Sequence, residues 1–174
     1  MGVTPQSYLY NADNGVPGDI TRTDETNVEP AMLIASGSPA VFAQAFGIPM
    51  AYATGGITQF QSTNAAADFA GVLVREVPGI SGNFNQGLLD TTPYPAVPQG
   101  LAVRGYVSVV CKYGTPARGG VVYVQITAHS GAIPGDFRAD GTDSGNAVAL
   151  TATQAEWATD GKDSNNNAEL RIAR

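Results

Sequence analysis

The stretch Leu101-Ala-Val-Arg-Gly-Tyr-Val-Ser-Val-Val-Cys-Lys112 alternates apolar side chains with polar or small ones. A period of two residues is typical of a strand with one buried face, because successive side chains point to opposite sides of a sheet. We expect one face of this strand to be apolar and the other to be polar. The apolar face comprises Val103, Val107, Val109 and Cys111, and the polar face comprises Arg104, Tyr106, Ser108 and Lys112.

A second run with the same period follows closely in the sequence. In Gly120–Ile126, the side chains of Val122, Val124 and Ile126 fall on one face. The eight residues 113–120 that join the runs include three glycines and one proline, which favour a turn. The two runs therefore predict an antiparallel hairpin, with a loop longer than the commonest ones.

Further short strands are predicted on both sides of this hairpin. Segments rich in glycine, proline and asparagine separate them, and Pro49 places the strand that contains it at a sheet edge. Roughly seven to nine short strands of this kind predict an all-β fold, namely a β-sandwich, a jelly-roll-like domain or a barrel of antiparallel strands. The further strands are predicted at residues 47–52, 57–61, 69–77, 137–139, 147–151, 154–157 and 168–172.

The composition divides the chain into two parts. Residues 1–36 contain few apolar side chains and no sustained periodicity, so we expect an extended N-terminal arm or surface loops there. Residues 37–174 are expected to form one β core domain, since the chain has 174 residues and most single domains are of this size. Residues 80–99 predict a long loop, and a loop of that length is usually functional or held by a partner.

The charge pattern argues against binding to nucleic acid or to a membrane. The formal net charge is −6, and lysines and arginines are scattered singly. No basic cluster is present to neutralise phosphates, and no apolar run is long enough to cross a bilayer. The N-terminus lacks the features of a signal peptide, so we expect synthesis in the cytoplasm.

Residues with catalytic or metal-binding chemistry are few. The only histidine, His129, lies beside Ser130, but the chain has no Gly-x-Ser-x-Gly motif, so we expect a solvent-exposed loop histidine. The acidic loops 136–143 and 160–163 depart from the spacing of calcium loops. The single cysteine, Cys111, is expected to be an inert core thiol, and one cysteine with one histidine excludes zinc in practice. The sequence therefore predicts no enzyme and no cofactor.

Eight short segments occur in a fixed order along the chain. They are Pro17-Gly-Asp-Ile-Thr-Arg22, Val28-Glu-Pro30, Phe46-Gly-Ile-Pro-Met50, Gly71-Val-Leu-Val-Arg-Glu76, Val103-Arg-Gly-Tyr-Val-Ser-Val109, Gly119-Gly-Val-Val-Tyr-Val-Gln-Ile126, Gly135-Asp-Phe-Arg-Ala139 and Ala168-Glu-Leu-Arg-Ile172. Together they resemble the capsid cement or decoration proteins of tailed bacteriophages. The family pattern often has proline after the strand-ending Val-Arg, whereas this chain has Glu76 there.

This resemblance implies a structural virion protein that binds the outer surface of a phage capsid and cements contacts between major capsid protein subunits. It implies the phage major capsid protein as partner, together with self-association as a dimer or trimer, and it supplies no catalytic residues. We expect the arm and the loop 80–99 to make the capsid contacts. Tyr8, Tyr10 and Tyr94 are the expected anchors, since aromatic side chains are enriched at interface hot spots.

Two other classes of function stay open from the sequence. Jelly rolls often bind sugars, so a carbohydrate-binding or adhesin module on a phage particle is the first alternative, although the chain has one tryptophan. A small hydrolase is the second, with His129 as the residue to test. Glu76 and Glu156 could act as paired carboxylates only if folding brought them together, and Trp157 is expected to be a core anchor.

Overall fold

The computed structural model describes residues 14–35, 43–75, 93, 98–143 and 145–173. These residues form strands joined by turns, with one short 3-10 helix, Ala66–Asp68, which confirms the predicted all-β class. The strands are β1 (Ile20–Met32), β2 (Pro49–Ala53), β3 (Gly56–Gln59), β4 (Phe69–Val74), β5 (Pro98–Tyr113), β6 (Tyr123–Gln125), β7 (Phe137–Arg138), β8 (Ala147–Ala149), β9 (Ala155–Trp157) and β10 (Asn167–Ile172).

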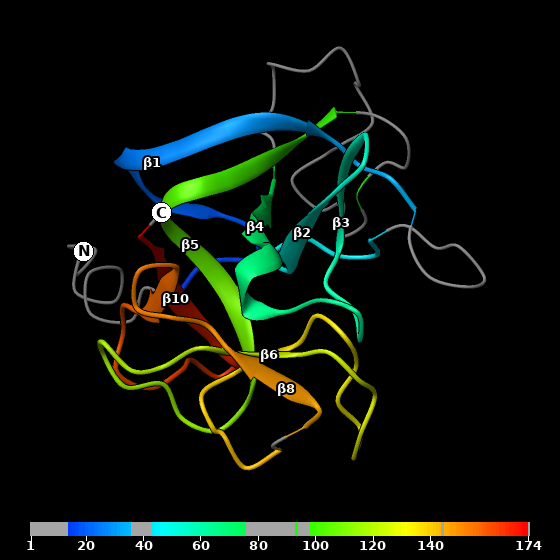
Figure 1. The fold of residues 1–174 in the computed structure, drawn as a ribbon. Helices are drawn as coiled ribbons and strands as arrows, with labels where there is room; N and C mark the ends of the chain where they lie inside the picture. Colours follow the sequence, from blue (N-terminus) through cyan, green and yellow to red (C-terminus); the bar gives the residue numbers. More distant parts are fainter. Residues whose placement is uncertain (1–13, 36–42, 76–92, 94–97, 144, 174) are drawn as a thin grey trace, which may run out of the picture.

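The long strand β5 is the central strand of the fold, because it pairs with neighbours along both of its edges (Figure 1). On one edge it pairs first with β4 and then with β10. On the other edge it pairs first with β1 and then with β7. The β5–β7 pair is parallel, whereas the other strand pairs are antiparallel, so the sheet is mixed.

The strand pairings close on themselves twice, and both rings contain β5. In the first ring, β10 pairs with β9, Glu156 of β9 bridges to Val121, and the chain continues from Val121 into β6, which returns to β5 through β7. In the second ring, β4 leads through β2 to β3, and Ile57 of β3 bridges to Leu33 at the end of β1. Two barrel-like rings that share one strand therefore describe the fold.

A bend in β5 distributes its side chains between two hydrophobic clusters (Figure 1). Leu101 and Val103 belong to one cluster, whereas Val107, Val109 and Cys111 belong to the other. The predicted apolar face is therefore buried as expected but divided between two cores. The larger cluster also contains Phe60, Phe69, Val124, Phe137, Trp157 and Leu170, and the smaller one also contains Leu33, Phe46, Met50, Ile57 and Leu73.

Gly105 lies where β5 changes partners, and its backbone has a φ of 114°. A β-carbon at this position would lie 2.3 Å from Oγ1 of Thr26 in β1. Opposite Gly105, the register of β1 jumps from Arg22, which pairs with Tyr106, to Asn27, which pairs with Arg104. Residues 23–26 of β1 therefore form an excursion out of register, in which Thr26 packs directly against Gly105, where there is no side chain.

Three local predictions are wrong. The hairpin of β5 and β6 does not form, because the two residues of β7 insert between these strands and pair with both. The strand that starts at Pro49 is internal, since β2 pairs with β3 and β4, and the proline is tolerated as its first residue. Ser108 is buried instead of exposed, because residues 18 and 19 hydrogen-bond to its backbone.

Residues 20–32 were not predicted as a strand, yet they form β1 along β5. None of the side chains of β1 is buried, so backbone pairing holds the strand without an apolar face that the sequence could reveal. The division into an arm at 1–36 and a core at 37–174 stays a prediction, and residues 1–13 and 36–42 lie outside the described part of the chain.

The variant Gly105→Ala is expected to lose about 2–3 kcal/mol of folding stability, because a residue forced into this backbone region costs roughly 1–3 kcal/mol and its methyl group would overlap Thr26. Thermal unfolding followed by circular dichroism measures the loss. Gly119→Ala is the control, since Gly119 also has positive φ but has open space around it. A loss from Gly105→Ala no larger than that of the control would contradict the fit between Gly105 and Thr26.

Candidate functional site

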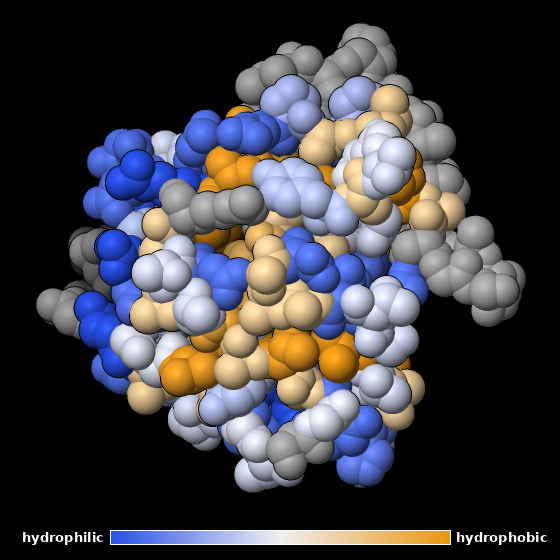
Figure 2. Space-filling model, in the orientation of Figure 1, coloured by the Kyte–Doolittle hydropathy of each residue, from blue (hydrophilic) through white to orange (hydrophobic). Residues whose placement is uncertain are grey.

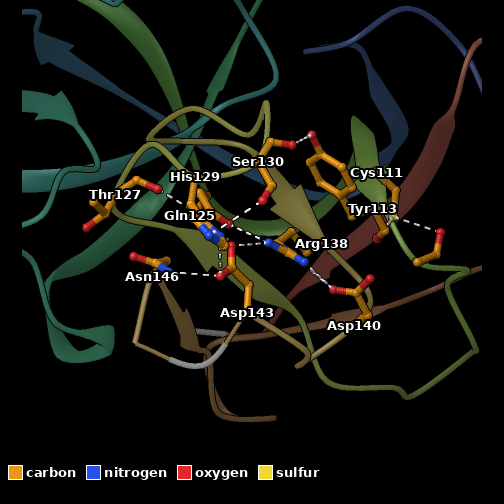
Figure 3. A network of polar contacts seen from close by, with 11 residues as sticks. Cys111, Tyr113, Gln125, Thr127, His129, Ser130, Arg138, Asp140, Asp143 and Asn146 are labelled. Carbon is orange, nitrogen blue, oxygen red and sulfur yellow. Dashed lines mark hydrogen bonds and ion pairs between the residues drawn. The ribbon is translucent and has the colours of Figure 1, made fainter.

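The densest group of polar contacts surrounds Arg138, the last residue of the short strand β7 (Figure 3). The Arg138 side chain is 7% exposed. Its Nε and one terminal nitrogen donate to Oδ1 of Asp140 at 3.0 and 2.7 Å, and the other terminal nitrogen donates to Oδ2 of Asp143 at 2.7 Å and to Oε1 of Gln125 at 2.8 Å. The guanidinium lies 4.8 Å from the ring centre of Tyr113. Arg138 thus joins β5, β6 and the loop after β7.

Asp143 accepts hydrogen bonds from several donors at once, although the loop that carries it has no regular structure. Asn146 donates to its Oδ1 at 2.9 Å and Gln125 donates to its Oδ2 at 2.9 Å, while Nδ1 of His129 lies 2.8 Å from Oδ1. These contacts lower the pKa of Asp143 from its ordinary 3.8 to about 2, with the hydrogen bond from Asn146 as the largest cause, followed by the one from Gln125.

The contribution of Asp143 to folding stability is expected to depend on pH between about pH 4 and pH 2. Because its pKa is lower in the folded protein, the contribution is present above the ordinary pKa and is lost as the pH falls toward about 2. We therefore expect Asp143→Asn to be less stable than the parent at neutral pH but to lose less stability between pH 4 and 2. Urea unfolding at several pH values measures this, with Glu29→Gln, at an exposed site, as control. Parallel stability curves for parent and Asp143→Asn would contradict the expectation.

Ser130, His129 and Asp143 lie in the order of a nucleophile, a base and a carboxylate, as Figure 3 shows. Oγ of Ser130 is 3.5 Å from Nε2 of His129, whose other ring nitrogen contacts Asp143. Ser130 is exposed, however, and sits with Gly131 in a tight turn between His129 and Ala132, with φ values of 50° and 85°. The prediction of an exposed loop histidine is correct, since the His129 side chain is 54% exposed, but its contact with Asp143 was not predicted.

The carboxylates considered for calcium are engaged by the protein itself. Asp140 and Asp143 accept from Arg138. Asp160 accepts from the backbone N–H of Arg118, and Asp163 accepts from the backbone N–H groups of Asn165 and Asn167. The described residues contain no group of three or more potential ligands that could hold a metal ion.

The residues considered for sugar chemistry are not brought together in the part of the chain that is described. Trp157 is 1% exposed and belongs to the larger hydrophobic cluster, so its ring is not a platform for a sugar. Glu156 is ion-paired with Arg171 at 2.6 Å. Glu76 lies outside the described residues, and so do the predicted interface anchors Tyr8, Tyr10 and Tyr94.

Residues 14–19, which we call the latch, connect the two rings at the start of the described chain. The backbone N–H of Asn14 donates to Oδ2 of Asp163 at 3.1 Å, and its side chain donates to the carbonyl of Asn167 at 2.9 Å. Nε of Arg75, just after β4, donates to the carbonyl of Pro17 at 3.0 Å. The latch therefore fixes the position of Asn14, the first described residue.

A polar groove of about 530 Å³ lies at the bend of β5. Its floor includes Gly105 and Ile172, which are buried. Its walls come from the excursion of β1, from the neighbours of Gly105 in β5 and from the end of β10. The wall residues are Asp24, Glu25, Thr26, Asn27, Arg104, Tyr106, Arg171 and Ala173. Sequence patterns could not reveal this groove, because its walls come from three separate strands.

Comparison with known proteins shows a family and similarity to solved structures. The family model described as structural cement protein (E217 gp24/Pam3 gp6) matches residues 4–173. The fold is similar to a chain in "The capsid of Myoviridae Phage XM1", with a TM-score of 0.66, 14% sequence identity, and coverage of 100% of this chain and 99% of that chain. No curated protein matches the sequence. Within the described residues, no helix has the length and apolar character to span a membrane.

Proposed function

Because this chain belongs to the phage structural cement protein family, and is thus a structural protein of the virion capsid, we propose that it binds the outer capsid surface and stabilises contacts between major capsid protein subunits. The family match over residues 4–173 carries this proposal. The expected homo-oligomer, a dimer or trimer, belongs to the same proposal. Weak contacts that are repeated over a symmetric shell add up to strong binding.

The described strands suit a cement protein because they are extensively paired and packed around two hydrophobic clusters. β5 is paired along both edges, and two hydrophobic clusters fill the rings on either side of its bend. Preorganisation of this kind lowers the conformational entropy that is lost on binding.

The charges of the described residues support a position on the outside of the shell and away from the genome. The chain carries a net charge of −6, and binding to nucleic acid needs unpaired cations that neutralise phosphates. Arg22, Arg138 and Arg171 are each ion-paired with a carboxylate of the same chain. These arginines therefore contribute little free positive charge.

The chain is expected to have no hydrolytic activity, although Ser130, His129 and Asp143 are aligned. Ser130 lies exposed in a tight turn, whereas acyl transfer needs a water-excluding site with oriented donors for the oxyanion. Hydrolysis of p-nitrophenyl acetate by the parent should equal that by Ser130→Ala and His129→Gln. A parent rate tenfold above both variants would contradict a purely structural role.

The proposed function is tested by adding the purified protein to capsids that lack it and sedimenting the mixture. We expect co-sedimentation at a fixed ratio to the major capsid protein, which saturates as the protein concentration rises. A glycan array probed in parallel tests the sugar-binding alternative. Failure to sediment with its cognate capsids would contradict the proposal.

A further inference from the structure

The excursion of β1, residues 23–26, is a rigid acidic projection, which we call the knuckle. Oγ1 of Thr26 donates to the carbonyl of Arg22 at 2.6 Å and accepts from the backbone N–H of Tyr106 at 3.0 Å. Thr26 also lies directly over Gly105. These contacts leave the side chains of Asp24 and Glu25 exposed at the surface, and Figure 2 shows hydrophilic side chains gathered over β1.

The other wall of the groove is positive. Arg104 of β5 is exposed and makes no hydrogen bond or salt bridge with any residue that the structure describes. Arg171 of β10 lies on the same wall and is paired with Glu156. Neither Asp24 nor Glu25 forms a hydrogen bond or salt bridge with the described residues. After the carboxylate hydrogen bond that each arginine makes, longer-range attraction from Glu25 also contributes to the raised pKa of Arg22 and Arg171. The groove therefore combines two acidic side chains with Arg104, none of which makes a hydrogen bond or salt bridge with the described residues.

An aromatic side chain of the groove lining is held in place by a cation. The ring of Tyr106 is half-buried and has the guanidinium of Arg22 3.9 Å from its centre. Arg22 is itself held by Glu169, with a contact of 2.8 Å. Tyrosine and arginine are the residue types enriched at interface hot spots. The strand that carries the knuckle also exposes Val28 and Met32, at 37% and 41%.

We propose that this groove is the site of symmetric self-association, in which the knuckle of each copy enters the groove of a second copy. A two-fold interface brings a patch against an identical patch, so that residue i of one copy contacts residue j of the other and the reverse. Asp24 and Glu25 of each copy then face Arg104 of the other. A single patch that carries an acidic projection next to a hollow lined by arginine is complementary to an identical patch on a second copy.

The net charge of the chain explains why the site needs such local pairing. Two copies that each carry −6 repel one another at long range, and salt screens this repulsion beyond about 8–10 Å. Close Arg104–carboxylate pairs offset this repulsion locally, and burial of Tyr106, Val28 and Met32 adds to the attraction. The inference deepens the proposed function, since a symmetric pair could bridge two capsid sites, but the pairing itself is tested without capsids.

The experiment is sedimentation velocity of the full-length chain over a range of concentrations. We expect the parent to dimerise, Arg104→Glu and Glu25→Arg each to weaken dimerisation at least tenfold, and the double variant with both changes to recover to within about threefold of the parent. Arg118→Glu, which alters an exposed arginine outside the groove, is the charge-matched control and should dimerise as the parent does. Thermal unfolding checks that each variant is folded.

A parent that stays monomeric at all concentrations would overturn the proposal, as would single variants that dimerise normally or a double variant that does not recover. Capsid sedimentation separates this result from the proposed function. If the parent is monomeric at all concentrations and Arg104→Glu still loses capsid binding, the groove is assigned to the capsid protein and self-association is overturned. Dimerisation without any capsid binding would leave the interface standing and contradict only the cement role.

Discussion

Deletion of residues 1–13 is expected to leave a folded protein whose occupancy on capsids falls by at least about tenfold. The fold should survive because the latch begins at Asn14, whose contacts with Asp163 and Asn167 are retained. The occupancy should fall because the deletion removes Tyr8 and Tyr10, and a hot-spot side chain contributes about 2 kcal/mol or more, with 1.4 kcal/mol equal to a factor of ten. Quantified co-sedimentation with capsids measures the effect.

A double variant, Tyr8→Ala with Tyr10→Ala, separates the aromatic anchors from the length of the arm. We expect it to lose most of the occupancy that the deletion loses. Tyr52→Ala is the matched control, since Tyr52 is 50% exposed on the internal strand β2. Full occupancy after the deletion would refute the role of the arm, and an equal loss from Tyr52→Ala would show that the effect is not specific to it.

The variant Arg138→Met is expected to lose about 3–5 kcal/mol of folding stability, because removing one partner of a buried ion pair leaves an uncompensated buried charge. The Asp143 side chain is 8% exposed, and it would lose the Arg138 guanidinium, whose terminal nitrogen lies 2.7 Å from Oδ2 of Asp143. For a chain of this size, 1 kcal/mol corresponds to about 2–4 °C in Tm, so we expect Tm to fall by about 6–20 °C. Scanning calorimetry measures the change.

Two comparisons make this prediction specific. Arg22→Met breaks a contact of similar length, 2.8 Å to Glu169, but the Arg22 side chain is 42% exposed, so we expect a loss below about 1 kcal/mol. Adding Asp143→Asn to Arg138→Met should recover part of the lost stability, since it removes the unpaired charge. Similar losses from Arg138→Met and Arg22→Met would argue against a special role of burial at Arg138.

Among the strands that the sequence predicted correctly, β5 and β10 have a buried face, and their period of two is visible without any tertiary information. β4 was predicted from a continuous apolar run, which fits its burial on both faces. β1 escaped prediction because it has no buried side chain and depends on backbone pairing with β5. Such a strand looks the same as a loop at the level of sequence pattern.

The pairing of strands depended on contacts that sequence patterns do not contain. The hairpin prediction assumed that β5 and β6 pair because they are neighbours in the chain. The two residues of β7 displace that pairing, and Arg138 is held there by Asp140, Asp143 and Gln125. The contact of His129 with Asp143 and the groove over Gly105 likewise join residues from different segments, so only the folded structure brings them together.

The most direct test of the central claim is the heat resistance of capsids with and without this protein. Capsids that lack the protein are heated alone, with the parent protein and with the variant that lacks residues 1–13, and intact shells are counted after sedimentation and by electron microscopy. The cement role predicts that the parent raises the temperature at which half the shells break, in proportion to its occupancy, and that the deletion variant does so far less. Shells that bind the parent to saturation and still break at the same temperature would contradict the account.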